Sequence, residues 1–276
     1  MQCGKYNFDL SHPLVMGILN VTPDSFSDGG QHYLLDDALR HAEQMLSAGA
    51  KIIDVGGEST RPGASAVELQ QEIDRTIPVI EKITANLDVA VSIDTSKAAV
   101  MREAVSVGAG MINDVMALQA EGALQVAAQT DDSIAICLMH MQGQPRTMQQ
   151  NPTYDDVVED VNNFLLQRID CCKQAGISSS RLVVDPGFGF GKTLSHNLQL
   201  LKNLERFLQT GCTVLAGISR KSMIGALLDN AVAADRVVGS VAAALIAYQK
   251  GARIIRVHDV KETVDALKIA HAVMHA

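Results

Sequence analysis

Four polar side chains that can hydrogen-bond a ligand stand at the ends of short apolar runs. Asp54, Asp94 and Asp185 carry carboxylates, and Asn113 carries an amide. A buried group of this kind without a partner costs about 1–3 kcal/mol, so side chains that face one cavity must find partners there. We interpret the four as a frame for a heterocycle rich in N–H groups. The alternatives are simple strand-end caps and a metal cage, although catalytic zinc sites use mainly His, Cys and Glu ligands.

Cationic side chains occur at similar positions, although the chain carries a net charge of −8. Positive groups gathered on one face of an acidic protein favour an anionic substrate. The alternative is that these side chains bond to backbone carbonyls of the loops. The negative net charge argues against a nucleic-acid partner, which needs a basic surface. The cationic residues are Arg61, Arg146, Arg220, Lys221, Arg256 and His258.

The segment from Asp185 to Thr193 reads D-P-G-F-G-F-G-K-T. It misses the P-loop pattern, because Pro186 stands where that motif needs glycine. Its alternating glycines also misplace the third glycine of a dinucleotide-binding fingerprint. The sequence therefore predicts a mobile or tightly turned loop in which Phe188 and Phe190 offer flat apolar surfaces.

The elements that must position these side chains alternate regularly. Eight apolar runs are separated by stretches of helical periodicity that are long enough for crossovers between parallel strands. We predict an α/β fold, a single (β/α)8 TIM barrel over residues 1–276 with its active site at the C-terminal ends of the strands. The predicted strands are Leu14–Leu19, Lys51–Val55, Val89–Ile93, Met111–Ile112, Ile134–Met139, Leu182–Val184, Thr213–Gly217 and Arg253–Val257. The predicted helices are Tyr33–Ala48, Val67–Ile83, Lys97–Val107, Gln119–Gln129, Tyr154–Gln174, Ser195–Leu208, Val237–Gln249 and Lys261–His275.

Composition narrows the class of protein further. Hydrophobic residues make up 47% of the chain, enough for a full core, yet no apolar run approaches the roughly 20 residues of a membrane span. The amino terminus lacks the pattern of a signal peptide, so we expect a cytoplasmic protein. Five cysteines without a Cys-x-x-Cys motif indicate buried or incidental thiols in a reducing compartment.

Seven segments resemble, in order, the motifs of the bacterial dihydropteroate synthases. They are Met16–Gly29, Asp54–Gly63, Ser92–Thr95, Ile112–Val115, Asp185–Gly191, Ser219–Ser222 and Arg256–His258. The resemblance implies condensation of 6-hydroxymethyl-7,8-dihydropterin diphosphate with 4-aminobenzoate, which gives 7,8-dihydropteroate and pyrophosphate. It also implies that the carbon–oxygen bond breaks first and leaves a pterin methylene cation. Such a step needs mainly positioning and electrostatic stabilisation of the leaving group.

The resemblance also implies where the pterin and the anion bind. Asp94, Lys221, Arg256 and His258 are the implied catalytic residues. Asn20 is the implied ligand of Mg²⁺, a cation that takes few protein ligands beside phosphate oxygens and water. The pterin site falls on Asp94, Asn113, Met139, Asp185, Lys221 and Arg256. The pyrophosphate site falls on Asn20, Thr60, Arg61, Arg256 and His258.

The implied 4-aminobenzoate pocket draws on two long loops, Val21–Gly30 and Gly56–Ala66, which we expect to act as lids. Asp24 and Asp54 are expected either to belong to the lids or to support the residues that contact the ligands, and Asp24 either to help gather the metal or to order its loop. Met116 departs from the polar or basic residue expected after the Ile112–Val115 motif. The pocket residues are Phe26, Thr60, Arg61, Pro62, Phe190 and Ser219.

Three other functions remain open from the sequence. A pterin-binding methyltransferase that uses methyl-tetrahydrofolate would share the barrel and pterin frame, but it would not need Arg256, His258 or the Thr60–Pro62 loop. A catalytically silent pterin-binding paralogue is the second alternative. A Schiff-base aldolase acting through Lys221 is the third.

The chain also predicts a partner. Val237–Ala247 contains no charged residue, whereas an outer barrel helix should expose a polar face. Close packing of small residues against the barrel is one explanation. The resemblance implies dimers, so we expect a homodimer formed through the late helices.

Overall fold

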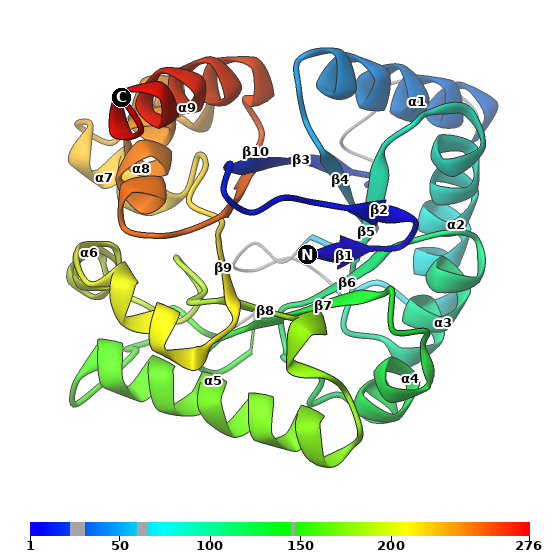
Figure 1. The fold of residues 1–276 in the computed structure, drawn as a ribbon, viewed down its shortest axis with the longest axis horizontal. Coiled ribbons are helices and arrows are strands. Elements are labelled where there is room, and N and C mark those ends of the chain that lie inside the picture. Colours follow the sequence, from blue (N-terminus) through cyan, green and yellow to red (C-terminus); the bar gives the residue numbers. More distant parts are fainter. Residues whose placement is uncertain (23–30, 60–65, 145–146) are drawn as a thin grey trace.

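Eight parallel strands form a closed barrel in the computed structural model, which describes residues 1–22, 31–59, 66–144 and 147–276. The strand order is β10-β3-β4-β5-β6-β7-β8-β9 (Figure 1), so each strand pairs with its neighbours in sequence and the last pairs with the first. The predicted α/β barrel is confirmed. The strands are β3 (Leu14–Asn20), β4 (Ile52–Gly56), β5 (Ala90–Asp94), β6 (Met111–Asp114), β7 (Ala135–Met139), β8 (Leu182–Asp185), β9 (Thr213–Ala216) and β10 (Ile254–Val257).

Helices surround the barrel, as Figure 1 shows. No helix among the described residues is both long and apolar enough to cross a membrane. The α-helices are α1 (Gln31–Ser47), α2 (Leu69–Asn86), α3 (Ala98–Ser106), α4 (Ala123–Gln129), α5 (Val157–Gln174), α6 (Leu194–Lys202), α7 (Ser222–Leu227), α8 (Val237–Gln249) and α9 (Val260–Met274). Short 3₁₀ helices are η2 (Ser179–Arg181), η3 (Leu204–Thr210) and η4 (Ala233–Arg236).

Several predicted boundaries were wrong, for local reasons. The predicted helix Ser195–Leu208 is broken, because Asn203 ends α6 by donating from Nδ2 to the Gln199 carbonyl at 2.9 Å before η3 begins. The predicted helix Gln119–Gln129 starts only at Ala123, after Gly122 adopts a left-handed φ of 76°. Strand β6 extends to Asp114, so Asn113 lies within the strand. Helix α7 was not predicted.

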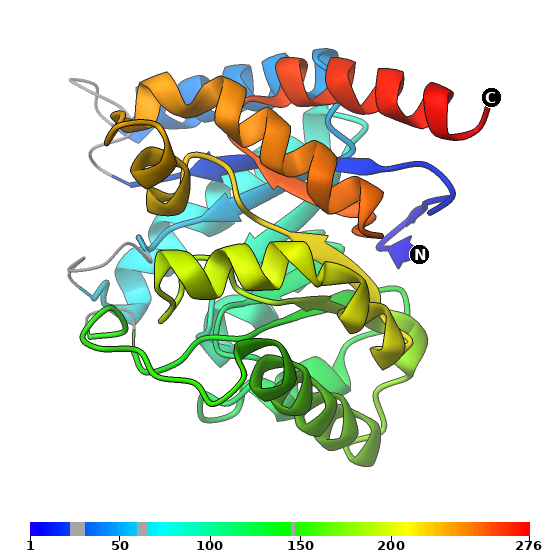
Figure 2. The ribbon, with the colours of Figure 1, turned by 90° about the vertical axis from the view of Figure 1, so that its left-hand side faces the viewer.

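A small hairpin at the amino terminus, also not predicted, closes one end of the barrel. Strands β1 (Gln2–Cys3) and β2 (Tyr6–Asn7) pair antiparallel. Cys3 is fully buried, and Tyr6, Phe8 and Leu10 pack against the barrel interior. Figure 2 shows the hairpin on the side where β3 begins, opposite the carboxyl ends of the strands. The hairpin therefore leaves the predicted active-site end open.

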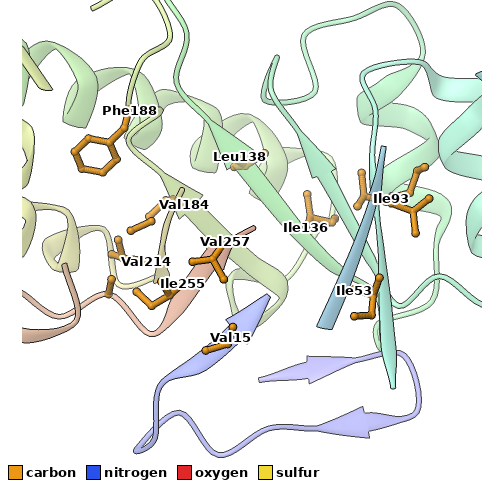
Figure 3. Packing of buried hydrophobic residues seen from close by; sticks show 14 of the residues in the cluster. Val15, Ile53, Ile93, Ile136, Leu138, Val184, Phe188, Val214, Ile255 and Val257 are labelled. Atoms are coloured by element: carbon orange, nitrogen blue, oxygen red, sulfur yellow. The ribbon is translucent and has the colours of Figure 1, made fainter. Parts of the chain in front are cut away.

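Side chains of each strand alternate between two cores, because successive residues of a strand point to opposite faces. One core lies between the strands and the helices (Figure 3) and includes Val15, Ile53 and Ile93. The other fills the barrel and includes Leu14, Met16, Ile52, Ala90, Met111, Ala135, Cys137, Val183, Leu215 and Ile254.

The interior positions change from apolar to polar along each strand. In β5 the inward series is Ala90, Ser92 and Asp94, and in β10 Ile254 is followed by Arg256. A residue that obeys the same two-residue period as a core side chain must face the same space. The polar strand ends noted in the sequence therefore converge on the barrel mouth, beyond the apolar residues that fill the barrel.

Ser92 tests whether the polar groups of the barrel interior have hydrogen-bond partners. Its hydroxyl is fully buried and has no hydrogen-bond partner among the described residues. Because an unsatisfied buried hydroxyl costs stability, Ser92→Ala should leave the free energy of unfolding unchanged or raise it by up to about 1 kcal/mol. Urea unfolding measures the change.

Ser240→Ala is the matched control, because the buried Ser240 hydroxyl donates to the Arg236 carbonyl at 2.6 Å and accepts from the Arg220 N–H at 2.9 Å. This variant should lose about 1–2 kcal/mol. An equal loss in both variants would show that the Ser92 hydroxyl has a stabilising partner.

Candidate active site

The barrel mouth brings together most of the described residues that the sequence singled out. Strand register places Asp94 beside Asn113 and Met139 beside Asp185. Asn20 lies at the end of β3, paired with Gly56 of β4. These side chains come from five different strands, so no short stretch of sequence could have created the site.

Arg256 joins two carboxylates at the centre of the mouth. Its Nε donates to Asp54 Oδ2 at 2.6 Å, and its second terminal nitrogen donates to Asp94 Oδ2 at 2.7 Å. Asn113 Nδ2 donates to the same Asp54 oxygen at 3.0 Å. Asp54 is completely buried, and its Oδ1 has no partner among the described residues. Of the two roles expected for Asp54, part of a lid or support for residues that contact the ligands, the structure shows the second: Asp54 lies within the barrel and orients Arg256 and Asn113.

The shared guanidinium shifts the acid–base properties of the cluster. Burial raises the pKa of Asp94 to about 7, with Arg256 opposing the shift and Asp54 adding to it. Burial also works to lower the pKa of Arg256, but the charges of Asp54 and Asp94 raise it above its ordinary value. Arg256 therefore stays charged, whereas Asp94 exchanges its proton near neutral pH.

Asp185 and Lys221 form the second charged pair of the mouth. Asp185 Oδ1 accepts from the Gly187 N–H at 2.8 Å, and burial raises the Asp185 pKa while Lys221 opposes the shift. Burial lowers the Lys221 pKa to about 8, against the pull of Asp185. The Lys221 ammonium donates to the Phe188 carbonyl and lies 4.5 Å from the centre of the Phe190 ring.

Gly217 lies next to Asp185 and Arg256 in the mouth. A Cβ at this glycine would lie 3.7 Å from Asp185 Oδ2 and 3.8 Å from Arg256 Cβ. Gly217 therefore lies between the side chains of Asp185 and Arg256. Three carboxylates, an amide, a guanidinium and an ammonium thus surround one space and can recognise a flat ligand with donors and acceptors on its edges.

Ser219 and His258 extend the mouth along β9 and β10. The Ser219 hydroxyl lies 3.0 Å from His258 Nδ1 and accepts from the His258 backbone N–H at 3.1 Å. Arg220 does not join them. Its guanidinium forms an ion pair with Asp259, with Nε 2.9 Å from Oδ2. Asp259 thus offsets the charge that Arg220 was expected to add to the cationic face.

The side-chain oxygen of Asn20 lies at the barrel mouth and is a ligand suited to a hard cation. Its Oδ1 would lie 3.9 Å from a Cβ built at Gly56, on the side of Asp94. Mg²⁺ takes oxygen ligands, often one or two from the protein with the rest from phosphate and water. An amide oxygen at the end of β3 fits that pattern.

Some predicted site residues lie outside the described part of the chain. They are Asp24, Phe26, Thr60, Arg61, Pro62 and Arg146. Of the predicted aminobenzoate pocket, the structure describes Phe190 and Ser219. The sequence analysis also assigned no role to Lys192, a buried cation in the loop after β8. A lysine within a glycine-rich, otherwise uncharged segment was the available signal.

Comparison with known families and structures defines the class of protein. Residues 16–258 match the family described as pterin binding enzyme. The matched span runs from the first barrel strand to the end of the last, so it covers all of the strands that build the mouth. The barrel and its polar mouth are thus those of a pterin-binding enzyme.

Similar proteins narrow that class. The dihydropteroate synthase of Escherichia coli (strain K12) is 56% identical over 270 residues, which cover 98% of this chain and 95% of the relative. The Haemophilus influenzae dihydropteroate synthase is 56% identical over 268 residues, covering 97% and 96%. A Yersinia pestis dihydropteroate synthase structure, in a sulfonamide drug complex, superposes with a TM-score of 0.94 at 55% identity, covering 100% and 99%. The chain belongs to the dihydropteroate synthase family.

The raised pKa of Asp94 has a measurable consequence for stability. Between its ordinary pKa of 3.8 and about 7, the folded protein holds a proton that the unfolded chain releases, so stability falls as pH rises through this window. Asp94→Asn removes this titration. From pH 4 to pH 8, the stability of the variant relative to wild type should therefore rise by about 1–3 kcal/mol.

Asp131→Asn is the control of opposite sign. The Ser133 N–H, 2.8 Å from Asp131 Oδ1, lowers the Asp131 pKa, so that carboxylate stabilises the fold above its ordinary pKa. This variant should lose stability relative to wild type as the pH rises. Thermal unfolding curves that keep Asp94→Asn parallel to wild type across the range would contradict the raised pKa of Asp94.

Proposed function

We propose that the chain condenses 6-hydroxymethyl-7,8-dihydropterin diphosphate with 4-aminobenzoate to form 7,8-dihydropteroate and pyrophosphate. The observation that carries the proposal is the charged frame at the barrel mouth, in a chain that matches dihydropteroate synthases over nearly its whole length. A Xanthomonas albilineans dihydropteroate synthase solved in complex with 7,8-dihydropteroate superposes with a TM-score of 0.87 at 44% identity. This match favours the synthase over a methyltransferase.

The pterin ring occupies the space between Asp94, Asn113 and Asp185. Its amino and N–H groups donate to the two carboxylates, because ionised acceptors form the stronger hydrogen bonds. Asn113, oriented by Asp54, bonds to the ring edge. Met139 lies beside Asp185 in the strand register, where its polarizable sulfur suits contact with an aromatic ligand.

Lys221 and Arg256 provide the donors of the pterin site. Lys221 donates to the ring oxygen and nitrogen from beside Asp185. The planar guanidinium of Arg256 can lie against the pterin face, a contact that lysine cannot make. Arg256 is already held by Asp54 and Asp94, and Lys221 by the Phe188 carbonyl, so the ligand meets oriented donors.

The diphosphate binds at Asn20, Arg256 and His258, together with Thr60 and Arg61. When the carbon–oxygen bond breaks, its electron pair leaves with pyrophosphate, and positive groups stabilise that charge where it develops. Asn20 would hold Mg²⁺, which supplies further charge neutralisation at the phosphate oxygens when bound. The aniline nitrogen of 4-aminobenzoate then bonds to the pterin methylene carbon and releases a proton.

The 4-aminobenzoate pocket uses Ser219 and Phe190, which lie near His258 and Lys221 respectively. Phe26, Thr60, Arg61 and Pro62 complete the pocket. An aromatic side chain beside the ammonium of a pterin-binding lysine sets the second substrate next to the first. The reaction then depends on positioning, for which no strong general base is needed.

Pyrophosphate release tests the reaction directly. The purified protein should release pyrophosphate only when the pterin diphosphate, 4-aminobenzoate and Mg²⁺ are all present. Asp185→Asn should lower kcat/KM by about 10²-fold, because it removes a charge-assisted bond and the counter-charge of Lys221.

Asp170→Asn is the control, since this carboxylate lies on the exposed face of α5, 3.9 Å from Lys173. It should keep wild-type activity. A protein that binds pterin but forms no dihydropteroate is the silent paralogue. Methyl transfer from methyl-tetrahydrofolate without pyrophosphate chemistry would identify the methyltransferase.

The chain acts as a cytoplasmic homodimer that pairs through its late helices. Helices α7, α8 and α9 lie together in Figure 1 and carry apolar side chains that face outward. Val238 is 82% exposed, Ile269 is 69% exposed and Val273 is 72% exposed. Exposed apolar side chains on neighbouring helices favour a protein partner.

Light scattering tests the dimer. At micromolar concentration the mass should be about twice 29.5 kDa, and Val238→Lys should shift it toward the monomer because a charge enters an apolar interface. Leu166→Lys, on the distant helix α5, should leave the mass unchanged. A wild-type mass of one chain would remove the proposal.

A further inference from the structure

Lys192 lies in the loop that follows β8, and its side chain bonds to the backbone of that same loop. Its side chain is buried, with only 3% of the residue exposed. The ammonium nitrogen lies 2.9 Å from each of three acceptors, the Gly187 carbonyl, the Phe190 carbonyl and His140 Nδ1. The His140 carbonyl lies 3.4 Å away. One side chain thus ties both ends of the turn to the loop after β7.

The chemistry of the cluster matches its geometry. Burial lowers the pKa of Lys192, against the charge of Asp185, yet the three N–H donors of an ammonium group match the three acceptors at the shorter distance. Burial, with the charge of Lys192 adding to it, lowers the His140 pKa to about 2, so the imidazole remains neutral and can accept at Nδ1. His140 is itself held edge-on against Phe164, with ring centres 4.9 Å apart. The cluster is therefore rigid and satisfied.

The loops after β7 and β8 pack in direct backbone contact. A Cβ at Gly187 would lie 1.8 Å from the His140 carbonyl oxygen, and one at Gly191 would lie 2.4 Å from the Gln142 carbonyl oxygen. Both glycines have positive φ, 71° and 62°, which side chains other than glycine rarely adopt. The turn that carries Phe190 is consequently fixed by backbone contacts on one side and by Lys192 beneath.

The remaining carbonyls of the turn are also bonded. The Phe188 carbonyl accepts from Lys221, the Gly189 carbonyl from Gln149, and the Gly191 carbonyl from the Tyr154 hydroxyl at 2.8 Å. Two lysines therefore hold one turn from opposite sides. Lys221 belongs to the pterin site, whereas Lys192 contacts only the loop and His140.

We propose that Lys192 is a positioning residue that, anchored by His140, holds Phe190 beside Lys221 and thereby sets the affinity for 4-aminobenzoate. The proposal rests on the proposed function, which places Phe190 in the aminobenzoate pocket. Asp94, Asn113 and Asp185 of the pterin frame lie on strands β5, β6 and β8, whereas Phe190 lies on the turn itself. Loss of Lys192 therefore weakens the second substrate selectively.

Lys192→Met removes the three donors and keeps a side chain of similar length. It should raise the KM for 4-aminobenzoate by about tenfold or more, because displacing a binding group slightly is costly. The KM for the pterin diphosphate should stay within about twofold, because β5, β6 and β8 hold its partners. Equal rises in both constants, or no rise in the aminobenzoate KM of a folded variant, would overturn the proposal.

Arg181→Met is the matched control. Arg181 is also a buried cation beside β8, but at the opposite end of that strand, where Nε donates to the Ile134 carbonyl at 2.9 Å. Its loss should lower the melting temperature without changing either KM. A rise in the aminobenzoate KM of Arg181→Met equal to that of Lys192→Met would show a general effect of lost stability.

A fluorescent reporter tests positioning independently of the reaction. The chain contains no tryptophan, so Phe190→Trp creates a single reporter on the turn. Time-resolved anisotropy should show restricted indole motion in this protein and in its combination with Arg181→Met, but faster local motion when Lys192→Met is combined with it. Equal motion in all three proteins would overturn the positioning role whether or not the protein is a synthase.

Tyr154→Phe keeps the proposal testable if Lys192→Met does not fold. It removes only the hydroxyl that holds the Gly191 carbonyl of the same turn. It should increase the local motion of the tryptophan at position 190 and raise the aminobenzoate KM. Unchanged motion and unchanged KM in the Tyr154→Phe protein would overturn the proposal.

Discussion

One guanidinium shared by two buried carboxylates is the constraint around which the barrel mouth is built. Arg256 reaches Asp54 and Asp94 from the last strand, across 202 and 162 positions of sequence. Charges removed from water are tolerated only when they are paired and hydrogen-bonded. Closure of the barrel satisfies this condition, because β10 pairs with β3 and brings Arg256 back to the strands that carry the two acids.

Hydrogen bonding within this cluster is incomplete, which leaves groups available to a ligand. Asp54 Oδ1 lacks a partner among the described residues, and Asp94 holds its proton to about pH 7. Buried polar groups that are not fully satisfied, with shifted pKa values, are typical of binding and catalytic sites. A pterin that donates to Asp94 favours its charged form, so ligand binding supplies an interaction that folding alone leaves unmade.

The sequence predicted the architecture because a barrel repeats a simple rule. Apolar runs mark the strands, and polar residues at their ends mark the mouth, which is why Asp94, Asn113 and Asp185 could be grouped without a structure. Motif order then supplied the roles. These signals are local or periodic, and they recur in each of the eight strand–helix units.

Features that depend on distant partners were missed. The ion pair between Arg220 and Asp259 could not be read from the sequence pattern. The contact between the Lys192 side chain and the turn that carries Phe190 could not be read from the sequence. The hairpin of β1 and β2 has strands of two residues, too short for any periodicity. In each case the deciding contact is tertiary, whereas the sequence pattern around the residue is neutral.

Proton release on pterin binding measures the role of this charged cluster most directly. With 6-hydroxymethyl-7,8-dihydropterin, which lacks the diphosphate, calorimetry at pH 7 in buffers of different ionisation enthalpy should show release of about half a proton, because Asp94 with a pKa of about 7 must ionise to accept from the ring. Asp94→Asn should bind the same ligand more weakly and release none. A binding enthalpy that does not depend on the buffer in the wild-type protein would contradict the central role of Asp94 and Arg256 in pterin binding.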